Sequence, residues 1–202
     1  FEDCRAHYKH PEKVVVTGTP VRGDFFELTK PQAKAKLGAD DGRPLIVSFW
    51  GSLGSGAMNR AMADFLALES AREPFHHIHG VGGICWADMQ RWLREREVGL
   101  PAHPALDVRE YIYDMATVMR AADLVICRAG ASTLSELTAL GVPAILVPSP
   151  NVTNHHQEKN AALLGDHGAA LVLAEDGLDG KRLFAAAAGL LRDGDRLAAM
   201  AE

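Results

Sequence analysis

The sequence predicts an α/β fold built on a Rossmann-like, doubly wound parallel sheet. Short runs of aliphatic and β-branched residues alternate along the chain with longer stretches whose apolar residues recur at helical spacing. The links between these runs are short, which favours successive strand–helix–strand units. Residues 124–127 are apolar at every position, as is typical of a strand that helices cover on both faces.

The individual elements follow from this alternation. Compact β-branched or aliphatic runs bounded by glycine, proline or polar residues predict strands at residues 13–17, 44–50, 75–78, 106–112, 124–127, 144–147 and 170–173. Amphipathic or alanine-rich stretches predict helices at residues 32–37, 57–68, 87–96, 115–121, 132–140, 155–167, 180–191 and 195–201.

Composition and charge exclude several classes of protein. The 202 residues are 48% hydrophobic, which is enough to bury one good core. The net charge of −5 argues against a nucleic-acid-binding surface, which needs clustered Lys and Arg. No run approaches the ~18 consecutive apolar residues of a membrane-spanning helix. Cys4, Cys85 and Cys127 are odd in number and lack the spacing of zinc ligands, which favours reduced thiols in a cytosolic protein.

The beginning of the chain differs from the rest. We expect residues 1–18 to be the end of a preceding unit followed by a linker, because Pro20 breaks the chain before a new unit starts. The first residue is Phe1 and not an initiator Met, so we expect a fragment or an excised domain.

The first candidate site is the glycine-rich segment 51–56, which follows a predicted strand and opens a predicted helix. Glycines allow a tight turn there and let a ligand approach the backbone, and free amides at a helix N-terminus favour a phosphate. The segment is neither a Walker loop nor a full dinucleotide-binding motif. An ordinary turn between strand and helix is an equally good interpretation.

The second candidate, residues 127–136, also joins a strand to a helix. Ser132 or Thr133 could cap the helix, and Glu136 could complete a capping box with Thr133. Alternatively, backbone amides beyond Gly130 face a ligand and Glu136 accepts hydrogen bonds from a sugar diol. From the residues alone, capping is the favoured interpretation.

The third candidate is the polar stretch 148–160, where two His and several amides follow the end of a strand. Ligands of open α/β sheets bind at that edge, so these side chains could contact sugar hydroxyls. Asn154 could instead be only a helix cap. Metal chelation by His155 and His156 is disfavoured, because neighbouring residues on a helix point about 100° apart.

Other residues carry weaker signals. Arg22 could bind a diphosphate through paired donors, although a lone Arg is more often a solvated surface charge. The chain contains no Gly-x-Ser-x-Gly nucleophile motif and no pair of carboxylates typical of a hydrolase. His77 and His79 alternate with apolar residues in a predicted strand, and we expect them at its surface or edge.

These segments occur together and in this order in one known family. Residues 17–22 resemble its Thr-Gly-Asn-Pro-Val-Arg hinge, residues 51–54 its second glycine-rich loop with Asn59 following, and residues 111–115 its Phe-Ile-Asp-Asp-Met stretch. Residues 122–137 closely match its signature, and residues 141–148 and 154–161 complete the pattern. Over about residues 14–170 the chain therefore resembles the C-terminal lobe of the MurG family of glycosyltransferases, which have the two-lobed GT-B fold.

The resemblance implies a site for UDP-N-acetylglucosamine. Arg22 and Ser52 would contact the diphosphate, and Ile112 would hold the uracil through its backbone. The α-phosphate and ribose would be lined by the amides and hydroxyls of Ala131, Ser132, Thr133, Leu134 and Ser135. The ribose hydroxyls would bond to Glu136, and the sugar hydroxyls would be recognised by His156, Gln157 and Asn160.

The resemblance also implies a reaction. Residues 1–19 would be the end of an N-terminal lobe and the hinge, and residues 20–202 the donor-binding domain. The enzyme would transfer N-acetylglucosamine, with inversion at the anomeric carbon, to a lipid-linked muramoyl-pentapeptide (lipid I to lipid II) in peptidoglycan synthesis. Neither a cofactor nor a metal is expected, because a helix N-terminus and Arg22 would offset the diphosphate charge.

The rest of the machinery is expected outside the chain. No catalytic residue is expected within it, because the family's proposed base, acceptor site and membrane-facing patch belong to the N-terminal lobe. We therefore expect this chain alone to be inactive. The full-length enzyme would be a peripheral protein on the cytoplasmic face of the cell membrane.

Departures from the family pattern leave other interpretations open. Thr19, Trp50, Ser55 and Tyr113 replace residues that are usual in the family, and Trp50 could alter the glycine-rich loop. The alternatives are another GT-B transferase or a UDP-N-acetylglucosamine epimerase, the donor-binding subunit of a split transferase, and a regulatory domain that only binds a small molecule. The His-Gln-x-x-Asn segment argues against the first pair.

Overall fold

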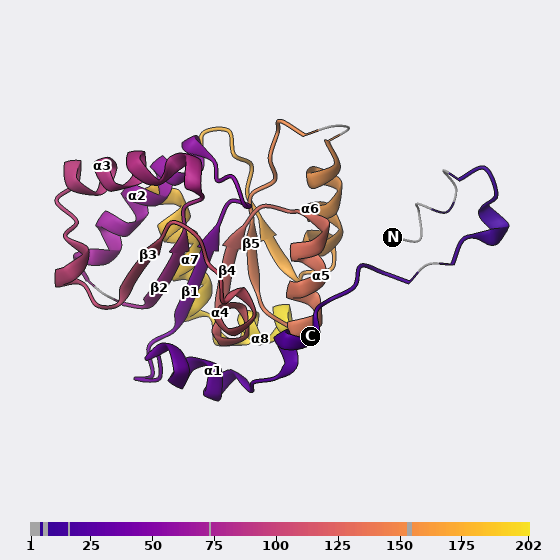
Figure 1. Cartoon of the computed structure of the whole chain (residues 1–202), viewed down its shortest axis with the longest axis horizontal. Helices are drawn as coiled ribbons and strands as arrows, with labels where there is room; N and C mark the ends of the chain where they lie inside the picture. Colours follow the sequence, from indigo (N-terminus) through magenta and orange to yellow (C-terminus); the bar gives the residue numbers. More distant parts are fainter. Residues whose placement is uncertain (1–4, 6–7, 16, 73, 153–154) are drawn as a thin grey trace.

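The computed structural model describes residues 5, 8–15, 17–72, 74–152 and 155–202. Its centre is a six-stranded parallel sheet with the strand order β3-β2-β1-β4-β5-β6 (Figure 1). The strands are β1 (Leu45–Phe49), β2 (His76–Gly80), β3 (Leu106–Arg109), β4 (Leu124–Cys127), β5 (Ala144–Leu146) and β6 (Ala170–Val172). The chain builds outward from β1 to β3 and then returns to the other side of β1, so the predicted doubly wound parallel sheet is confirmed.

Helices cover both faces of this sheet, with α4 in front of it and α7 behind it in Figure 1. The α-helices are α1 (Lys30–Leu37), α2 (Gly56–Ser70), α3 (Trp86–Glu95), α4 (Met115–Ala121), α5 (Ala131–Leu140), α6 (His156–Asp166), α7 (Gly180–Arg192) and α8 (Gly194–Ala201). Short 3-10 helices are η2 (Pro11–Lys13), η3 (Gly23–Phe26), η4 (Gly83–Cys85) and η5 (Leu100–Ala102). Each predicted helix is present, and its ends lie within two residues of the prediction.

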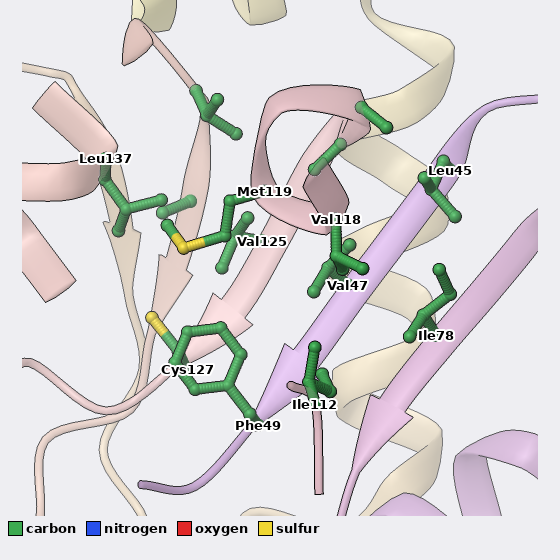
Figure 2. Close-up of a cluster of buried hydrophobic side chains, with 14 of the residues drawn as sticks. Leu45, Val47, Phe49, Ile78, Ile112, Val118, Met119, Val125, Cys127 and Leu137 are labelled. Atoms are coloured by element: carbon green, nitrogen blue, oxygen red, sulfur yellow. The ribbon is translucent and has the colours of Figure 1, made fainter. Parts of the chain in front are cut away.

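Two hydrophobic cores lie on opposite faces of the sheet because side chains alternate along each strand. Leu45, Val47 and Phe49 of β1 point into the core beneath α1, α4, α5 and α6, part of which Figure 2 shows. Ile46 points into the other core, beneath α2, α3, α7 and α8. Every residue of β4 is fully buried, which confirms the expectation for a strand covered on both faces.

The predicted strand at residues 13–17 is wrong for the residues that the structure describes there. Lys13 closes the η2 turn, and Val14, Val15 and Thr17 lie outside any strand. Val15 is 78% exposed, and the residues of this run that the structure describes pair with no other strand. The described residues from Tyr8 to Pro20 run away from the sheet and its helices (Figure 1).

The placement of His77 and His79 at a surface or edge is also wrong. Both side chains are buried, at 1% and 0% exposure, between β2 and the helices behind the sheet. Burial is tolerated because each ring nitrogen meets a polar partner, chiefly Ser48, Asn59 and Glu69. The alternation that suggests an exposed strand face therefore marks a buried polar network instead.

Asp123 fastens the first helix to the sheet. Its carboxylate accepts hydrogen bonds from the ammonium groups of Lys30 and Lys34 on α1 and from the backbone amide of Leu45, 2.7 Å away. Burial alone would raise the pKa of this carboxyl, but the two lysines and the amide outweigh it and hold the pKa below its usual value.

Among the described residues, no helix is both long and apolar enough to cross a bilayer.

Candidate functional site

The site lies at the carboxyl edge of the sheet, beside the switch point between β1 and β4, where ligands of doubly wound folds bind. A pocket of about 170 Å³ opens there. The ends of β1 and β2, the loops after β1, β2 and β3, the start of α4 and the first turns of α5 supply its lining: Phe49, Gly51, Ser52, Gly80, Gly82, Glu110, Tyr111, Ile112, Met115, Thr133 and Glu136. A larger hollow of about 770 Å³ lies beside β6, but none of the predicted site residues lines it.

The glycine-rich loop after β1 packs tightly against the loop after β2. Gly54 has a φ of 80°, and a Cβ there would lie 2.3 Å from the Val81 carbonyl oxygen. Gly82 has a φ of 85°, and its Cβ would lie 2.5 Å from the Gly54 nitrogen. Both positions therefore require glycine. The close packing presents Ser52, which is exposed, at the pocket.

Helix α5 begins at Ala131 with its N-terminus beside the pocket. The preceding residue, Gly130, provides no side-chain cap, and the amide of Leu134 donates the first helical hydrogen bond to the Gly130 carbonyl at 3.0 Å. The amides of Ala131, Ser132 and Thr133 thus have no intrahelical partner. Such amides, together with the helix dipole, favour an anion.

The predicted capping role of Ser132 or Thr133 is wrong, and so is the capping box with Glu136. Both hydroxyl residues lie inside the helix and past its first residue, so their side chains cannot cap its start. Glu136 is free of that role and lines the pocket together with Thr133. The alternative interpretation, in which amides beyond Gly130 face a ligand and Glu136 accepts hydrogen bonds from a sugar diol, stays a prediction.

Glu136 and Arg22 lie near each other at one corner of the site. Burial raises the pKa of Glu136, while nearby Arg22 lowers it and Asp24 raises it. Arg22 is exposed, forms an ion pair with Asp24 at 3.5 Å and lies over the ring of Phe25. A carboxylate that has lost part of its hydration gains from ligand hydroxyl donors, because they replace the water it no longer contacts.

Ile112 lines the pocket, while its side chain belongs to the core. The side chain is 4% exposed and lies near Phe49 at the carboxyl end of β1 (Figure 2). It lies across Gly80, where a Cβ would come within 3.0 Å of the Ile112 Cδ1. Tyr111 beside it is 46% exposed and packs on Tyr113, with ring centroids 5.0 Å apart.

The remaining predicted residues of α5 occupy different surroundings. Ser132 is exposed, and Ala131 and Ser135 are half-buried. Leu134 is 2% exposed within the core, and its amide is bonded inside the helix, so neither its side chain nor its amide faces the pocket. Of the predicted residues, the pocket itself brings together Ser52, Ile112, Thr133 and Glu136.

His156, Gln157 and Asn160 lie at the start of α6 and do not line this pocket. The Gln157 Oε1 accepts a hydrogen bond from the Ser149 amide at 3.0 Å, and the Asn160 Nδ2 donates to the Ala129 carbonyl at 3.1 Å. These bonds fasten α6 to the ends of β4 and β5, next to Gly130. The predicted cap Asn154 lies outside the described residues.

Arg128, which belongs to the family signature, is a structural residue of the site that was not predicted from its sequence. Its guanidinium donates to the carbonyls of Val147 and Pro148, to the Glu175 carboxylate at 2.7 Å and to the Ser55 hydroxyl at 3.1 Å. One side chain therefore ties together the loops after β1, β5 and β6. The available signal was an Arg placed directly after a wholly apolar strand, where a charge needs partners.

Trp50 does not disturb the glycine-rich loop in the way that its bulk suggests. Its side chain is 3% exposed and packs in the core on the α2 side of the sheet, beneath the Arg128 guanidinium. It is absent from the lining of the pocket. In the part of the chain that the structure describes, no group of three or more His, Cys, Asp or Glu is placed to hold a metal ion.

Comparison with known proteins places the chain in a family. The model of the glycosyltransferase family 28 C-terminal domain matches residues 45–202. A relative from Acetivibrio thermocellus, named UDP-N-acetylglucosamine–N-acetylmuramyl-(pentapeptide) pyrophosphoryl-undecaprenol N-acetylglucosamine transferase, is 39% identical over 202 residues, which are 100% of this chain and 53% of the relative. A relative of the same name from Caldanaerobacter subterraneus is 40% identical over 184 residues, or 91% of this chain and 50% of the relative.

Solved structures agree with this placement. The crystal structure of Acinetobacter baumannii MurG superimposes with a TM-score of 0.68 at 26% identity, over 95% of this chain and 53% of that one. The glycosyltransferase WaaG, with a TM-score of 0.67 at 19% identity over 98% of this chain and 53% of that one, shares the fold. The chain spans about half the length of the curated relatives it matches. It belongs to glycosyltransferase family 28, of which it carries the C-terminal domain.

Proposed function

We propose that this chain is the donor-binding lobe of a transferase that takes N-acetylglucosamine from UDP-N-acetylglucosamine. The observation that carries the proposal is the convergence of Ser52, Ile112, Thr133 and Glu136 on one pocket beside the open N-terminus of α5. The names of the Acetivibrio and Caldanaerobacter relatives supply the donor and the class of acceptor.

Each part of the donor matches one part of the site. The amides of Ala131, Ser132 and Thr133, with the Ser52 hydroxyl, would hold the diphosphate, and Arg22 would approach from the open side. The backbone of Ile112 would pair with the uracil edge, and Glu136 would accept from the ribose hydroxyls. His156, Gln157 and Asn160 would lie at the far end, by the sugar.

The proposed reaction is a single displacement with inversion. An acceptor hydroxyl attacks the anomeric carbon from the face opposite UDP and gives up its proton to a base outside this chain. The bond from that carbon to the β-phosphate oxygen breaks, and UDP leaves with the electron pair. Negative charge grows on the diphosphate as this bond lengthens. Amide donors fixed at a helix N-terminus stabilise that charge without having to reorganise, and this is the contribution that the described residues can make.

The proposal extends to the longer protein. Residues 20–202 would form the donor lobe, and residues 1–19 the end of an N-terminal lobe and the hinge. That lobe would supply the acceptor site and the catalytic base, and this chain alone would not catalyse transfer. The lipid-linked acceptor named for the relatives would bring the full-length enzyme to the cytoplasmic face of the membrane.

Titration calorimetry tests the donor assignment. We expect binding of UDP and UDP-N-acetylglucosamine, with weaker binding of UDP-glucose because it lacks the acetamido group. CMP and free N-acetylglucosamine serve as controls and should not bind measurably. Equal affinity for UDP and CMP would contradict the role of Ile112, and the absence of binding by every uridine nucleotide would refute the proposed site.

A further inference from the structure

A chain of buried polar side chains connects the interior of the protein to the glycine-rich loop. It begins at Glu69 near the end of α2, whose Oε2 lies 2.6 Å from the Nδ1 of His77. The Ser48 hydroxyl stands between the two histidines, 2.7 Å from the Nε2 of His77 and 2.7 Å from the Nδ1 of His79. The Nε2 of His79 lies 3.0 Å from the Oδ1 of Asn59. All five side chains are at most 1% exposed.

The contacts of Asn59 indicate where the protons lie at this end of the network. The Val81 carbonyl can only accept, so the Asn59 Nδ2, 2.8 Å away, must be the group that points at it. The Asn59 Oδ1 then faces His79, whose Nε2 must carry the proton. Burial and the neighbouring His77 lower the pKa of His79 to about 3, which keeps its ring neutral and its Nδ1 bare. The Ser48 hydroxyl, 2.7 Å away, therefore donates to that Nδ1, and the Ser48 carbonyl oxygen lies farther from the same nitrogen, at 3.2 Å.

The Val81 carbonyl accepts the hydrogen bond from Asn59 and packs directly against the glycine-rich loop. The Gly54 backbone lies so close to this oxygen that a Cβ would come within 2.3 Å of it, and the Asn59 Nδ2 would be 3.3 Å from the same Cβ. Gly82, the next residue, meets Gly54 and Leu53 just as closely. Ser52, which lines the pocket, belongs to this loop. A rotation of the Val81 peptide would therefore displace the loop and move Ser52 from its place in the pocket.

We infer that Asn59, oriented by His79, is a positioning residue that sets the conformation of the diphosphate-binding loop. The inference rests on the proposed function, because that function assigns a ligand to the loop. Asn59 does not line the pocket and would not contact the donor. It acts through the Val81 carbonyl, and His79 acts one step further away by fixing which way the Asn59 amide faces.

Three variants and one control separate positioning from packing. In Asn59→Asp, a carboxylate oxygen replaces the donor and faces the Val81 carbonyl, so we expect a displaced loop and UDP affinity weakened roughly 10-fold or more. In His79→Leu the partner of the Asn59 Oδ1 is lost, and we expect a smaller loss of affinity. In His79→Gln a side-chain amide can still donate to Asn59, so affinity should recover relative to His79→Leu.

Met62→Ala is the matched control. Met62 lies on the same helix as Asn59 and is fully buried, but it does not line the pocket. It should lower the melting temperature while leaving the UDP affinity of the folded protein unchanged. Amide NMR shifts of Gly51, Gly54 and Gly82 in the free protein report the loop without any ligand. They should move in Asn59→Asp and His79→Leu and stay in place in Met62→Ala.

The outcomes distinguish this inference from the proposed function. Loop shifts that move in Asn59→Asp, with weakened UDP binding and recovery in His79→Gln, support it. Unchanged loop shifts and unchanged affinity in Asn59→Asp overturn it while leaving the donor site standing. Loss of affinity in Met62→Ala as large as that in Asn59→Asp would also overturn it, since general destabilisation would then explain both. If the wild-type protein binds no UDP, the proposed function fails, whatever the loop shifts show.

Discussion

Replacement of Glu136 tests the site most informatively, because it should change affinity without lowering stability. In the structure Glu136 is a half-buried carboxylate beside the pocket, it takes no part in a helix cap, and burial raises its pKa. Its proposed role is to accept hydrogen bonds from the two ribose hydroxyls. Glu136→Ala removes both acceptors, whereas Glu136→Gln leaves one carbonyl oxygen and adds an amide donor.

The magnitude follows from the number and kind of bonds lost. A hydrogen bond to a charged group contributes about 1.5–3 kcal/mol, and partial exposure places these two bonds at the weak end. The loss of both in Glu136→Ala should cost about 3 kcal/mol, which is a decrease in UDP affinity of roughly 150-fold. Glu136→Gln should cost about 1 kcal/mol, or roughly fivefold.

Stability should respond in the opposite direction. A carboxyl whose pKa is raised in the folded state destabilises that state at pH values above the folded pKa, and this penalty disappears as the pH falls below the unfolded pKa. Glu136→Gln should therefore match or slightly exceed the wild-type melting temperature at pH 8, and the difference should shrink toward pH 4. Titration calorimetry with UDP and thermal unfolding at both pH values measure this. Unchanged UDP affinity in Glu136→Ala, or a marked loss of stability at pH 8 in either variant, would refute the assigned role.

Variants at Asp123, at two glycines and at Arg128 test other parts of the structure. Asp123→Asn should lower the free energy of unfolding by about 2 kcal/mol at pH 7. Because the folded pKa of Asp123 is lowered, its contribution to stability is present above about pH 4 and disappears as the pH falls further. The free energies of unfolding of the variant and the wild type, measured by urea titration, should therefore converge at low pH. Gly54→Ala should weaken UDP binding, whereas Gly38→Ala, also at positive φ but in open space, should cost only about 1 kcal/mol of stability and leave UDP binding intact. Arg128→Leu should destabilise by about 2 kcal/mol in urea unfolding, with partial recovery in Arg128→Lys, which keeps the charge but lacks the planar donor group.

The local sequence pattern is sufficient to predict a helix or strand where burial and periodicity agree. Strand β4 and helix α4 begin and end at the predicted residues because each is bounded by a polar or conformationally distinct neighbour. Strand β3 ends at Arg109, three residues before the prediction, because the chain turns away from the sheet to form the wall of the pocket at Tyr111 and Ile112. The β-branched run near residue 15 predicts a strand, but Val15 is exposed. A strand needs a partner strand, and the local sequence does not reveal whether one is present.

The errors at the site have a common physical cause. A hydroxyl residue near a helix start can either cap the helix or lie within its first turn, and a shift of one or two residues decides between these outcomes. At Ser132 and Thr133 the shift excludes capping and leaves the amides open. The prediction that His77 and His79 are exposed was wrong because the partners that satisfy their buried ring nitrogens, Glu69 and Asn59, lie on another element. The same long-range pairing hid the role of Arg128, whose partners Val147 and Glu175 follow much later in the chain.

The most direct test is a crystal structure of this chain with UDP-N-acetylglucosamine bound. We expect the diphosphate oxygens about 3 Å from the amides of Ala131, Ser132 and Thr133. The uracil should pair with the backbone of Ile112, and the ribose hydroxyls should meet Glu136. A nucleotide bound beside β6 or at any other surface, with the N-terminus of α5 left unoccupied, would contradict the account.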